Sequence, residues 1–269
     1  MDAAYRVVNL VGRAALRALD VRLHWNGVEH VPPSGPVILA ANHVAYPDFV
    51  FIERAALERQ RYVRFLTRHD AWVPGVGWLL DRMRHVPVDR STAAAAYLRA
   101  RRLLAEGHAV GIFPEAGISY SYTVRPLMRG VAALARETGA PVVPVGVWGS
   151  QRIHSVGVPG APPSLVRGRR VDLTFGAPRY ADPDADLTAW TTDLGHTLTA
   201  MLERLQRLPE HAPRPGEHAV WHPAHLGGAA PTREQALDLD VVPRSAVSPT
   251  WGPDADVYRR VGRQGRPAR

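Results

Sequence analysis

Short apolar runs recur along this 269-residue chain, and longer amphipathic stretches separate them. Short apolar runs are typical of buried strands, whereas apolar residues spaced three and four apart are typical of helices. The runs that we predict as strands are residues 36–41, 62–66, 86–88, 109–113, 141–147 and 171–175. The stretches that we predict as helices are residues 2–19, 47–58, 71–83, 92–106, 129–138 and 186–207. This alternation predicts an α/β fold with a mixed, mostly parallel central sheet flanked by helices.

Composition changes near residue 208 and divides the chain into two parts. We predict one domain over residues 1–208 and a Pro- and Arg-rich C-terminal extension, irregular and partly disordered, over residues 209–269. Several histidines of the extension lack the partner set of a zinc site, and we interpret them as part of a polar tail. They are His211, His218, His222 and His225. The sequence therefore predicts no metal site.

The charge of the chain indicates an anionic partner, because all 33 basic residues are arginine and the net charge is +8. Nucleic acid, an anionic membrane surface and a phosphorylated substrate all carry the required charge. Guanidinium groups can hold a phosphate through two parallel hydrogen bonds. The chain has no cysteine, which excludes disulfides, a thiolate nucleophile and a cysteine-ligated metal.

Residues 2–19 predict a basic amphipathic helix, in which Arg6, Arg13 and Arg17 interrupt the apolar positions. Such a helix can lie in a membrane interface or pack on the core of its own domain, and both can hold on different faces. No segment approaches the ~20 uninterrupted apolar residues of a membrane span, and the start of the chain lacks the pattern of a signal peptide. We therefore expect a cytoplasmic protein that contacts the inner face of the cell membrane peripherally.

His43 and Asp48 lie at the junction between the first buried strand and the helix that follows it. A positioned imidazole can remove a proton from an alcohol, and a carboxylate can fix the orientation of that imidazole. Open α/β sheets bind ligands at the carboxyl ends of their strands, which is where this junction lies. In the alternative interpretation, Asp48 only caps its helix and His43 is an ordinary loop residue.

Three further blocks follow in order: Asp89-Arg90, Phe113-Pro114-Glu115 and Val143-Pro144-Val145. Together with His43 to Asp48, these blocks resemble the glycerophospholipid acyltransferase family, which acylates 1-acylglycerol-3-phosphate. The resemblance covers roughly residues 20–205 and implies that residues 1–208 form an acyltransferase domain. It implies a general base at His43, its carboxylate partner at Asp48 and a phosphate ligand at Arg90.

The third block matches the family at Phe113, Pro114, Glu115 and Ser119 and departs from it between them. The resemblance implies that Glu115 orders the acceptor pocket and that Gly117 lines it. Ala116, Gly117 and Ile118 stand where the family usually has Gly, Thr and Arg. That arginine normally contributes to phosphate recognition, and we expect Arg125 or Arg129 to bind the phosphate in its place.

The resemblance implies acyl transfer from an acyl thioester to the hydroxyl of a lysophospholipid, with 1-acylglycerol-3-phosphate as the leading acceptor. The donor is acyl-CoA or an acyl carrier protein, and the expected chemistry requires no cofactor, metal or nucleic acid. One alternative keeps the chemistry on another lysophospholipid or amphipathic alcohol. Another is a non-catalytic, basic protein that binds membranes or nucleic acid. Tryptophans can line an acyl groove or pack in the core, and we expect core packing for Trp72, Trp78 and Trp148.

Overall fold

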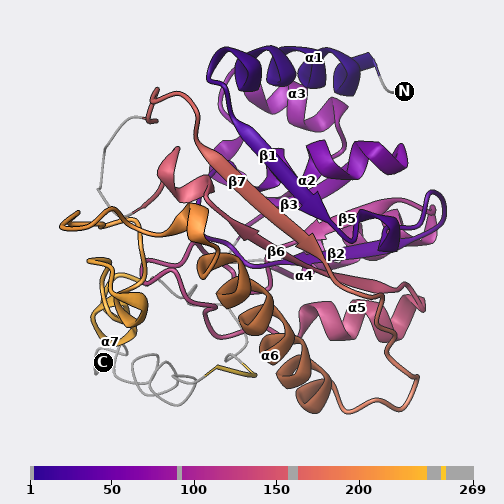
Figure 1. Ribbon diagram of the computed structural model, residues 1–269. Helices are drawn as coiled ribbons and strands as arrows, with labels where there is room; N and C mark the ends of the chain where they lie inside the picture. The colour runs from indigo at the N-terminus through magenta and orange to yellow at the C-terminus, as the bar shows by residue number, and fades with distance from the viewer. Residues whose placement is uncertain (1–2, 90–92, 157–162, 241–249, 253–269) are drawn as a thin grey trace, which may run out of the picture.

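The computed structural model describes residues 3–89, 93–156, 163–240 and 250–252, which build a seven-stranded sheet covered by helices (Figure 1). The strands are β1 (Arg22–Asn26), β2 (Val37–Ala41), β3 (Val63–Arg68), β4 (Val86–Val88), β5 (Ala109–Ile112), β6 (Val142–Trp148) and β7 (Arg170–Phe175). Their order across the sheet is β1-β7-β6-β2-β5-β3-β4. All neighbouring strands are parallel except β6 and β7, so the prediction of a mixed, mostly parallel sheet is confirmed.

The central strands are buried on both faces because apolar residues occupy nearly every position in them. Every residue of β2 and of β6 is buried, as expected for strands with helices on both sides. β4 lies at one edge of the sheet, where Pro87 is tolerated. The sequence does not predict β1 at the other edge, since its residues alternate between exposed and half-buried and form no apolar run.

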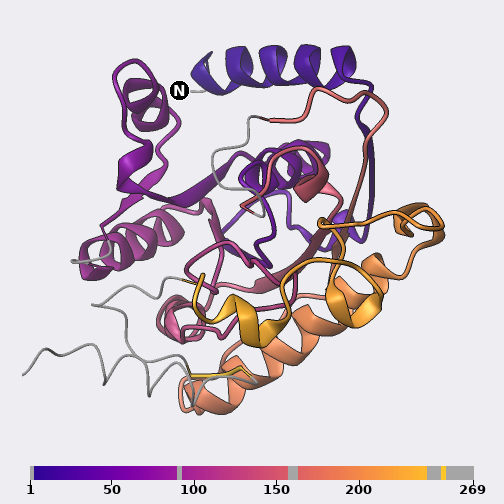
Figure 2. The same cartoon turned by 90° about the vertical axis from the view of Figure 1, so that its left-hand side faces the viewer.

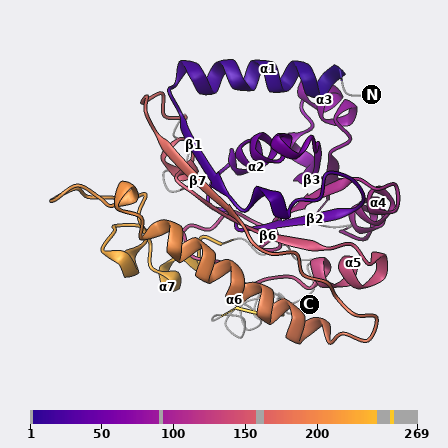
Figure 3. The same cartoon turned by 45° about the vertical axis from the view of Figure 1, so that its right-hand side comes forward.

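Helices cover the two faces of the sheet in separate groups (Figure 3). They are α1 (Ala3–Ala18), α2 (Asp48–Ala56), α3 (Val76–Arg82), α4 (Ala93–Ala105), α5 (Gly130–Thr138) and α6 (Leu187–Gln206). Ile38 and Ala40 of β2 point into a core with α4, α5 and α6. Leu39, between them, points to the opposite face and packs with α2, because side chains alternate along a strand.

The two faces of α1 have different surroundings. Tyr5 is buried and donates a hydrogen bond to the carbonyl oxygen of Val63 (2.6 Å). Val7, Leu10 and Val11 are exposed to solvent, at 61%, 70% and 63% of their surface. One side of α1 therefore packs on the domain while another presents apolar side chains outward.

Short helix α3 lies near the N-terminal end of α1 in the views of Figures 1 and 2. Trp78 of α3 is 62% exposed, and the guanidinium group of Arg82 lies over its ring. Trp148, at the end of β6, is fully buried. Core packing is therefore confirmed for Trp148 and wrong for Trp78.

The C-terminal extension has little regular structure as far as Asp240, in agreement with the sequence. Its helices are η5 (Pro209–His211), η6 (Ala224–Leu226) and α7 (Arg233–Ala236). The interpretation of its histidines as a polar tail is wrong for His211 and His222, which are buried with their rings against Trp148. Both histidine rings pack edge-on with this buried tryptophan, which places them in the core. Residues 253–269, with the terminal arginines, lie outside the described residues.

Candidate active site

The carboxyl ends of three neighbouring parallel strands, β6, β2 and β5, bring together residues from distant parts of the chain. His43 follows β2, Glu115 follows β5 and Ser150 follows β6. Asp48 is the first residue of α2, which starts directly after the His43 loop. This is the edge of the sheet at which open α/β folds bind their ligands.

His43 and Asp48 are in direct contact. Nδ1 of His43 lies 2.8 Å from Oδ2 of Asp48, and the aspartate side chain is fully buried whereas that of His43 is 17% exposed. Among the described residues, none forms a hydrogen bond with Nε2 of His43. A carboxylate on Nδ1 favours the tautomer in which Nε2 carries a lone pair, so this nitrogen can accept a proton.

Asp48 is fixed by more than its histidine. Its Oδ2 also accepts the backbone N–H groups of Val44 (2.8 Å) and Ala45 (2.9 Å), and its Oδ1 accepts the hydroxyl of Ser150 (2.5 Å). These donors hold the carboxylate in one orientation. The sequence gives no signal for Ser150, because it lies 102 residues from Asp48 and reaches it only through the pairing of β2 with β6.

The ring of His43 is also held by stacking and by its neighbours in the chain. It stacks on Phe113 with the ring centroids 3.9 Å apart and the planes 15° apart. The side-chain amide of Asn42 donates to the carbonyl oxygen of Val147 and accepts its N–H, which ties the end of β2 to β6. The resemblance includes Phe113 in a motif, but only the structure assigns these contacts to Phe113 and Asn42.

Glu115 links two parts of the site. Its Oε1 accepts the backbone N–H of His43 (2.8 Å), and its Oε2 accepts the backbone N–H of Arg125 (2.7 Å). Burial raises the pKa of Glu115 to about 8, and the two N–H bonds oppose that rise. Glu115 therefore fastens the loop after β5 to the backbone of the histidine.

Gly117 leaves room for the side chain of Arg125. A Cβ atom at position 117 would lie 2.3 Å from Nη1 of Arg125, which donates to the carbonyl oxygen of Ile118 (3.1 Å). Nε of Arg125 lies 3.3 Å from Oδ2 of Asp240, and the two side chains are only 6% and 3% exposed. The guanidinium group is thus held among protein groups, beneath the loop that carries Glu115.

The remaining predicted phosphate ligands are located differently. Arg129 is exposed and directly precedes α5. Arg90 lies outside the described residues. Within the described part of the chain, the structure brings His43, Asp48, Glu115, Gly117 and Arg125 together and leaves Arg129 on the surface. No group of three or more His, Asp or Glu side chains in that part could hold a metal ion.

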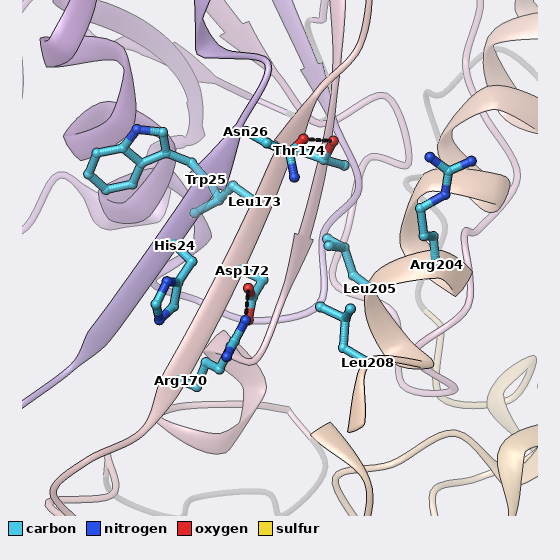
Figure 4. A pocket seen from close by; sticks show the side chains of 10 residues that line it. All are labelled: His24, Trp25, Asn26, Arg170, Asp172, Leu173, Thr174, Arg204, Leu205 and Leu208. Atoms are coloured by element: carbon cyan, nitrogen blue, oxygen red, sulfur yellow. Dashed lines mark hydrogen bonds and ion pairs between the residues drawn. The ribbon is translucent and has the colours of Figure 1, made fainter. Parts of the chain in front are cut away.

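A cavity of about 300 Å³ lies elsewhere, between edge strand β1, its neighbour β7 and the end of α6 (Figure 4). Its walls include Trp25, Asp172 and Leu205, and none of the predicted site residues lines it. β6 separates β7 from β2 in the sheet. This cavity is therefore not part of the site at His43.

Comparisons with known proteins agree with the geometry. Residues 22–148 match the protein-family model described as Acyltransferase. A chloroplastic 1-acyl-sn-glycerol-3-phosphate acyltransferase of Brassica napus is 28% identical over 139 residues, which are 50% of this chain and 39% of that protein. A 1-acyl-sn-glycerol-3-phosphate acyltransferase of Borreliella burgdorferi is 30% identical over 141 residues, 51% of this chain and 55% of that protein.

The fold has a solved counterpart in the crystal structure of the 1-acyl-sn-glycerophosphate acyltransferase PlsC from Thermotoga maritima. The two share a TM-score of 0.64 and 22% sequence identity over 76% of this chain and 80% of that one. The chain spans between 39% and 55% of the length of the two relatives named above. Residues 22–148 are thus similar in sequence to the Acyltransferase family, and the chain shares its fold with a solved acyltransferase.

Proposed function

We propose that this protein transfers an acyl group from an acyl thioester, acyl-CoA or acyl carrier protein, to the hydroxyl of a lysophospholipid. The observation that carries the proposal is the contact between Nδ1 of His43 and the buried carboxylate of Asp48, with Nε2 left without a protein partner among the described residues. A hydroxyl is a poor nucleophile at neutral pH, and a positioned base contributes about 10²–10⁴-fold to its reaction.

In this mechanism Nε2 of His43 takes the hydroxyl proton as the acceptor oxygen attacks the thioester carbon. Asp48 stabilises the imidazolium that forms, and the hydrogen bonds from Val44, Ala45 and Ser150 keep the carboxylate in place. The carbon–sulfur bond then breaks, and the leaving thiolate takes the proton from His43. The acyl group moves directly to the acceptor, and the proposal includes no cofactor.

The leading acceptor is 1-acylglycerol-3-phosphate, the substrate in the names of the relatives. Its phosphate would need cationic ligands close to His43. We propose Arg90 and Arg129 for this role, because Arg129 is exposed next to the loop that carries Glu115. Arg125 could join them only by leaving Asp240.

A second candidate is the same reaction on a lysophospholipid or amphipathic alcohol without a terminal phosphate. Two observations favour it: Ile118 stands where the family has an arginine, and Arg125 is already engaged by Asp240 and by the carbonyl oxygen of Ile118. A site with fewer free guanidinium groups discriminates less strongly for a phosphate dianion.

A thioester-release assay with a panel of lysolipids tests both candidates. We expect wild type to release thiol with lysophosphatidate, lysophosphatidylglycerol or lysophosphatidylcholine as acceptor, and His43→Ala to abolish the acceptor-dependent part. Preference for lysophosphatidate, lost in Arg129→Gln, supports the first candidate. Equal or better rates with the other lysolipids support the second. If His43→Ala were as active as wild type with every acceptor, the proposed mechanism would be wrong.

We further propose that the protein binds the anionic, cytoplasmic face of the cell membrane through α1 and α3. Within the described residues, no helix has both the length and the apolar character needed to cross a bilayer. α1 exposes Val7, Leu10 and Val11 beside basic side chains, and α3 adds Trp78. Apolar side chains inserted in the interface and arginines near anionic lipid act together in peripheral binding.

Sedimentation with vesicles of phosphatidylglycerol and of phosphatidylcholine tests the membrane proposal. Each arginine near an anionic surface contributes about 1 kcal/mol, which is about fivefold in binding. We expect Arg6→Gln and Arg13→Gln each to weaken binding to phosphatidylglycerol vesicles by that factor. Arg101→Gln is the matched control, since this exposed arginine lies on α4, on the other face of the sheet. Equal effects in all three variants would contradict the assigned surface.

A further inference from the structure

The C-terminal extension contacts one short segment of the domain at every second residue. The segment is residues 123–127, which lie between Glu115 and α5. Three contacts join the two: Arg233 Nε donates to Thr123 Oγ1 (3.2 Å), Asp240 pairs with Arg125 (3.3 Å), and Leu127 exchanges backbone hydrogen bonds with Thr250 (2.9 Å) and Trp251 (2.7 Å). Two of these contacts use side chains of the segment, and the third uses its backbone.

Hydrogen bonds through Glu115 connect this segment to His43, the proposed base. The backbone N–H of Arg125 donates to one oxygen of Glu115, and the backbone N–H of His43 donates to the other. A chain of four residues therefore runs from the extension to the proposed base: Asp240, Arg125, Glu115 and His43. Asp240 is nearly 200 residues from His43 in the sequence and lies outside the span matched by the family model.

The charges along this chain depend on one another. Arg125 and Asp240 are almost completely buried, and removing one member of such a pair leaves the other charge without compensation. Glu115 also faces both charges, since Arg125 favours its carboxylate and Asp240 disfavours it. Without Asp240, the carboxyl group available to neutralise Arg125 is that of Glu115, which would then turn away from the N–H of His43.

We propose that the C-terminal extension is a positioning element of the acyltransferase site, in which Asp240 holds the Arg125 cation so that Glu115 stays bound to the backbone of His43. This inference rests on the proposed function. Asp240 touches neither substrate nor His43, and its role is to keep the histidine in the geometry that proton transfer needs. Small displacements of a catalytic group cost up to about 100-fold in rate.

The test combines kinetics with a measurement that does not depend on turnover. We expect Asp240→Ala in the full chain to lower kcat about tenfold or more. Hydrogen exchange followed by mass spectrometry should show faster exchange in the peptide that contains the His43 amide. The double variant Arg125→Gln/Asp240→Ala should recover at least half of the lost kcat, because no unpaired cation remains to attract Glu115. Asp240→Asn provides the same comparison if Asp240→Ala does not fold.

Asp172→Asn is the matched control. Asp172 also joins the extension to the domain through a buried contact, with His211 (2.8 Å), but no contact among the described residues connects it to Glu115. We expect it to lower the melting temperature while kcat and the His43 peptide stay unchanged. A kcat of Asp240→Ala within twofold of wild type, unchanged exchange at His43, or no recovery in the double variant would each overturn the inference. If wild type acylates no lysolipid, the proposed function fails, and the exchange measurements still decide whether Asp240 holds the histidine.

Discussion

The described part of the chain contains two histidine–aspartate pairs with the same contact distance and opposite surroundings. In each pair a histidine nitrogen lies 2.8 Å from Oδ2 of an aspartate, His43 with Asp48 and His211 with Asp172. The side chain of His43 is 17% exposed, and that of His211 is 1% exposed. His43 is thus able to meet a substrate at Nε2, whereas the other nitrogen of His211 is buried, without a hydrogen-bond partner among the described residues.

The two aspartates also differ, in the groups that donate hydrogen bonds to their carboxylates. Asp48 accepts hydrogen bonds from two backbone N–H groups and a hydroxyl, which orient it without adding a cation. Asp172 accepts two hydrogen bonds from the guanidinium group of Arg170 as well as its histidine. A His–Asp distance therefore does not identify a catalytic pair by itself. Access to the second ring nitrogen and the partners of the carboxylate do.

The largest expected effect separates the two histidines. His43→Ala should lower kcat by about 10²–10⁴-fold because it removes the base, whereas His211→Ala should leave kcat within about threefold. Initial rates with an acyl thioester and the best lysolipid acceptor measure both. A loss of comparable size in the two variants would mean that burial does not distinguish the pairs.

The next effect separates the aspartates. Asp48→Asn should reduce kcat about 100-fold with little change in the acceptor KM, because an amide cannot accept hydrogen bonds at both positions and leaves the imidazole poorly oriented. Asp172→Asn should change kcat by less than twofold. Steady-state kinetics on both proteins, with circular dichroism to verify folding, make the comparison. Normal turnover in Asp48→Asn would remove Asp48 from the mechanism.

A smaller effect, on the stability of the fold, is expected from the pair of His211 and Asp172. Burial alone would raise the pKa of Asp172, but hydrogen bonds from His211 and Arg170 hold it below its usual value. His211→Ala removes one of these bonds and a ring packed on Trp148. We expect it to lower the free energy of unfolding by roughly 1–3 kcal/mol, measured by urea denaturation. His225→Ala, in the same extension, is the control and should cost less than half as much.

The smallest expected effect is a pH dependence of stability, to which Glu115, in the loop after β5, contributes. Burial raises the pKa values of Glu115 and Glu53 to about 8, far above those of exposed carboxyl groups. Between about pH 6.5 and pH 8 the folded protein then binds more protons at these groups than the unfolded chain, so stability falls as pH rises. The slope is at most about 1.4 kcal/mol per pH unit for each group.

Urea denaturation at pH 6.5 and pH 8 measures this slope. Glu115→Gln and Glu53→Gln should each make it shallower, and only Glu115→Gln should also lower kcat, because Glu53 bonds to the N–H of Val63 and not to His43. Asp172 contributes in the opposite range: its lowered pKa stabilises the fold above about pH 4, and that contribution is lost as pH falls further. An unchanged slope in Glu115→Gln would contradict the raised pKa.

The sequence predicts the strands and helices that build the site, because apolar periodicity is a local property of the chain. It predicts the buried strand before His43, the helix that starts beside Asp48 and the strand before Glu115, and the structure has all three. It does not predict β1, whose polar residues suit an edge strand and mimic a loop. It also misjudges His211 and His222, since burial of a polar ring depends on what lies across from it.

The sequence alone determined the order of the motifs and placed His43, Asp48 and Glu115 at strand ends, because both follow from local pattern. Tertiary structure decided which groups meet there. The pairing of β2 with β6 brings Ser150 to Asp48, and the return of the extension brings Asp240 to Arg125. Such contacts depend on the order of strands and on the path of the chain between them, and no short window of residues encodes either.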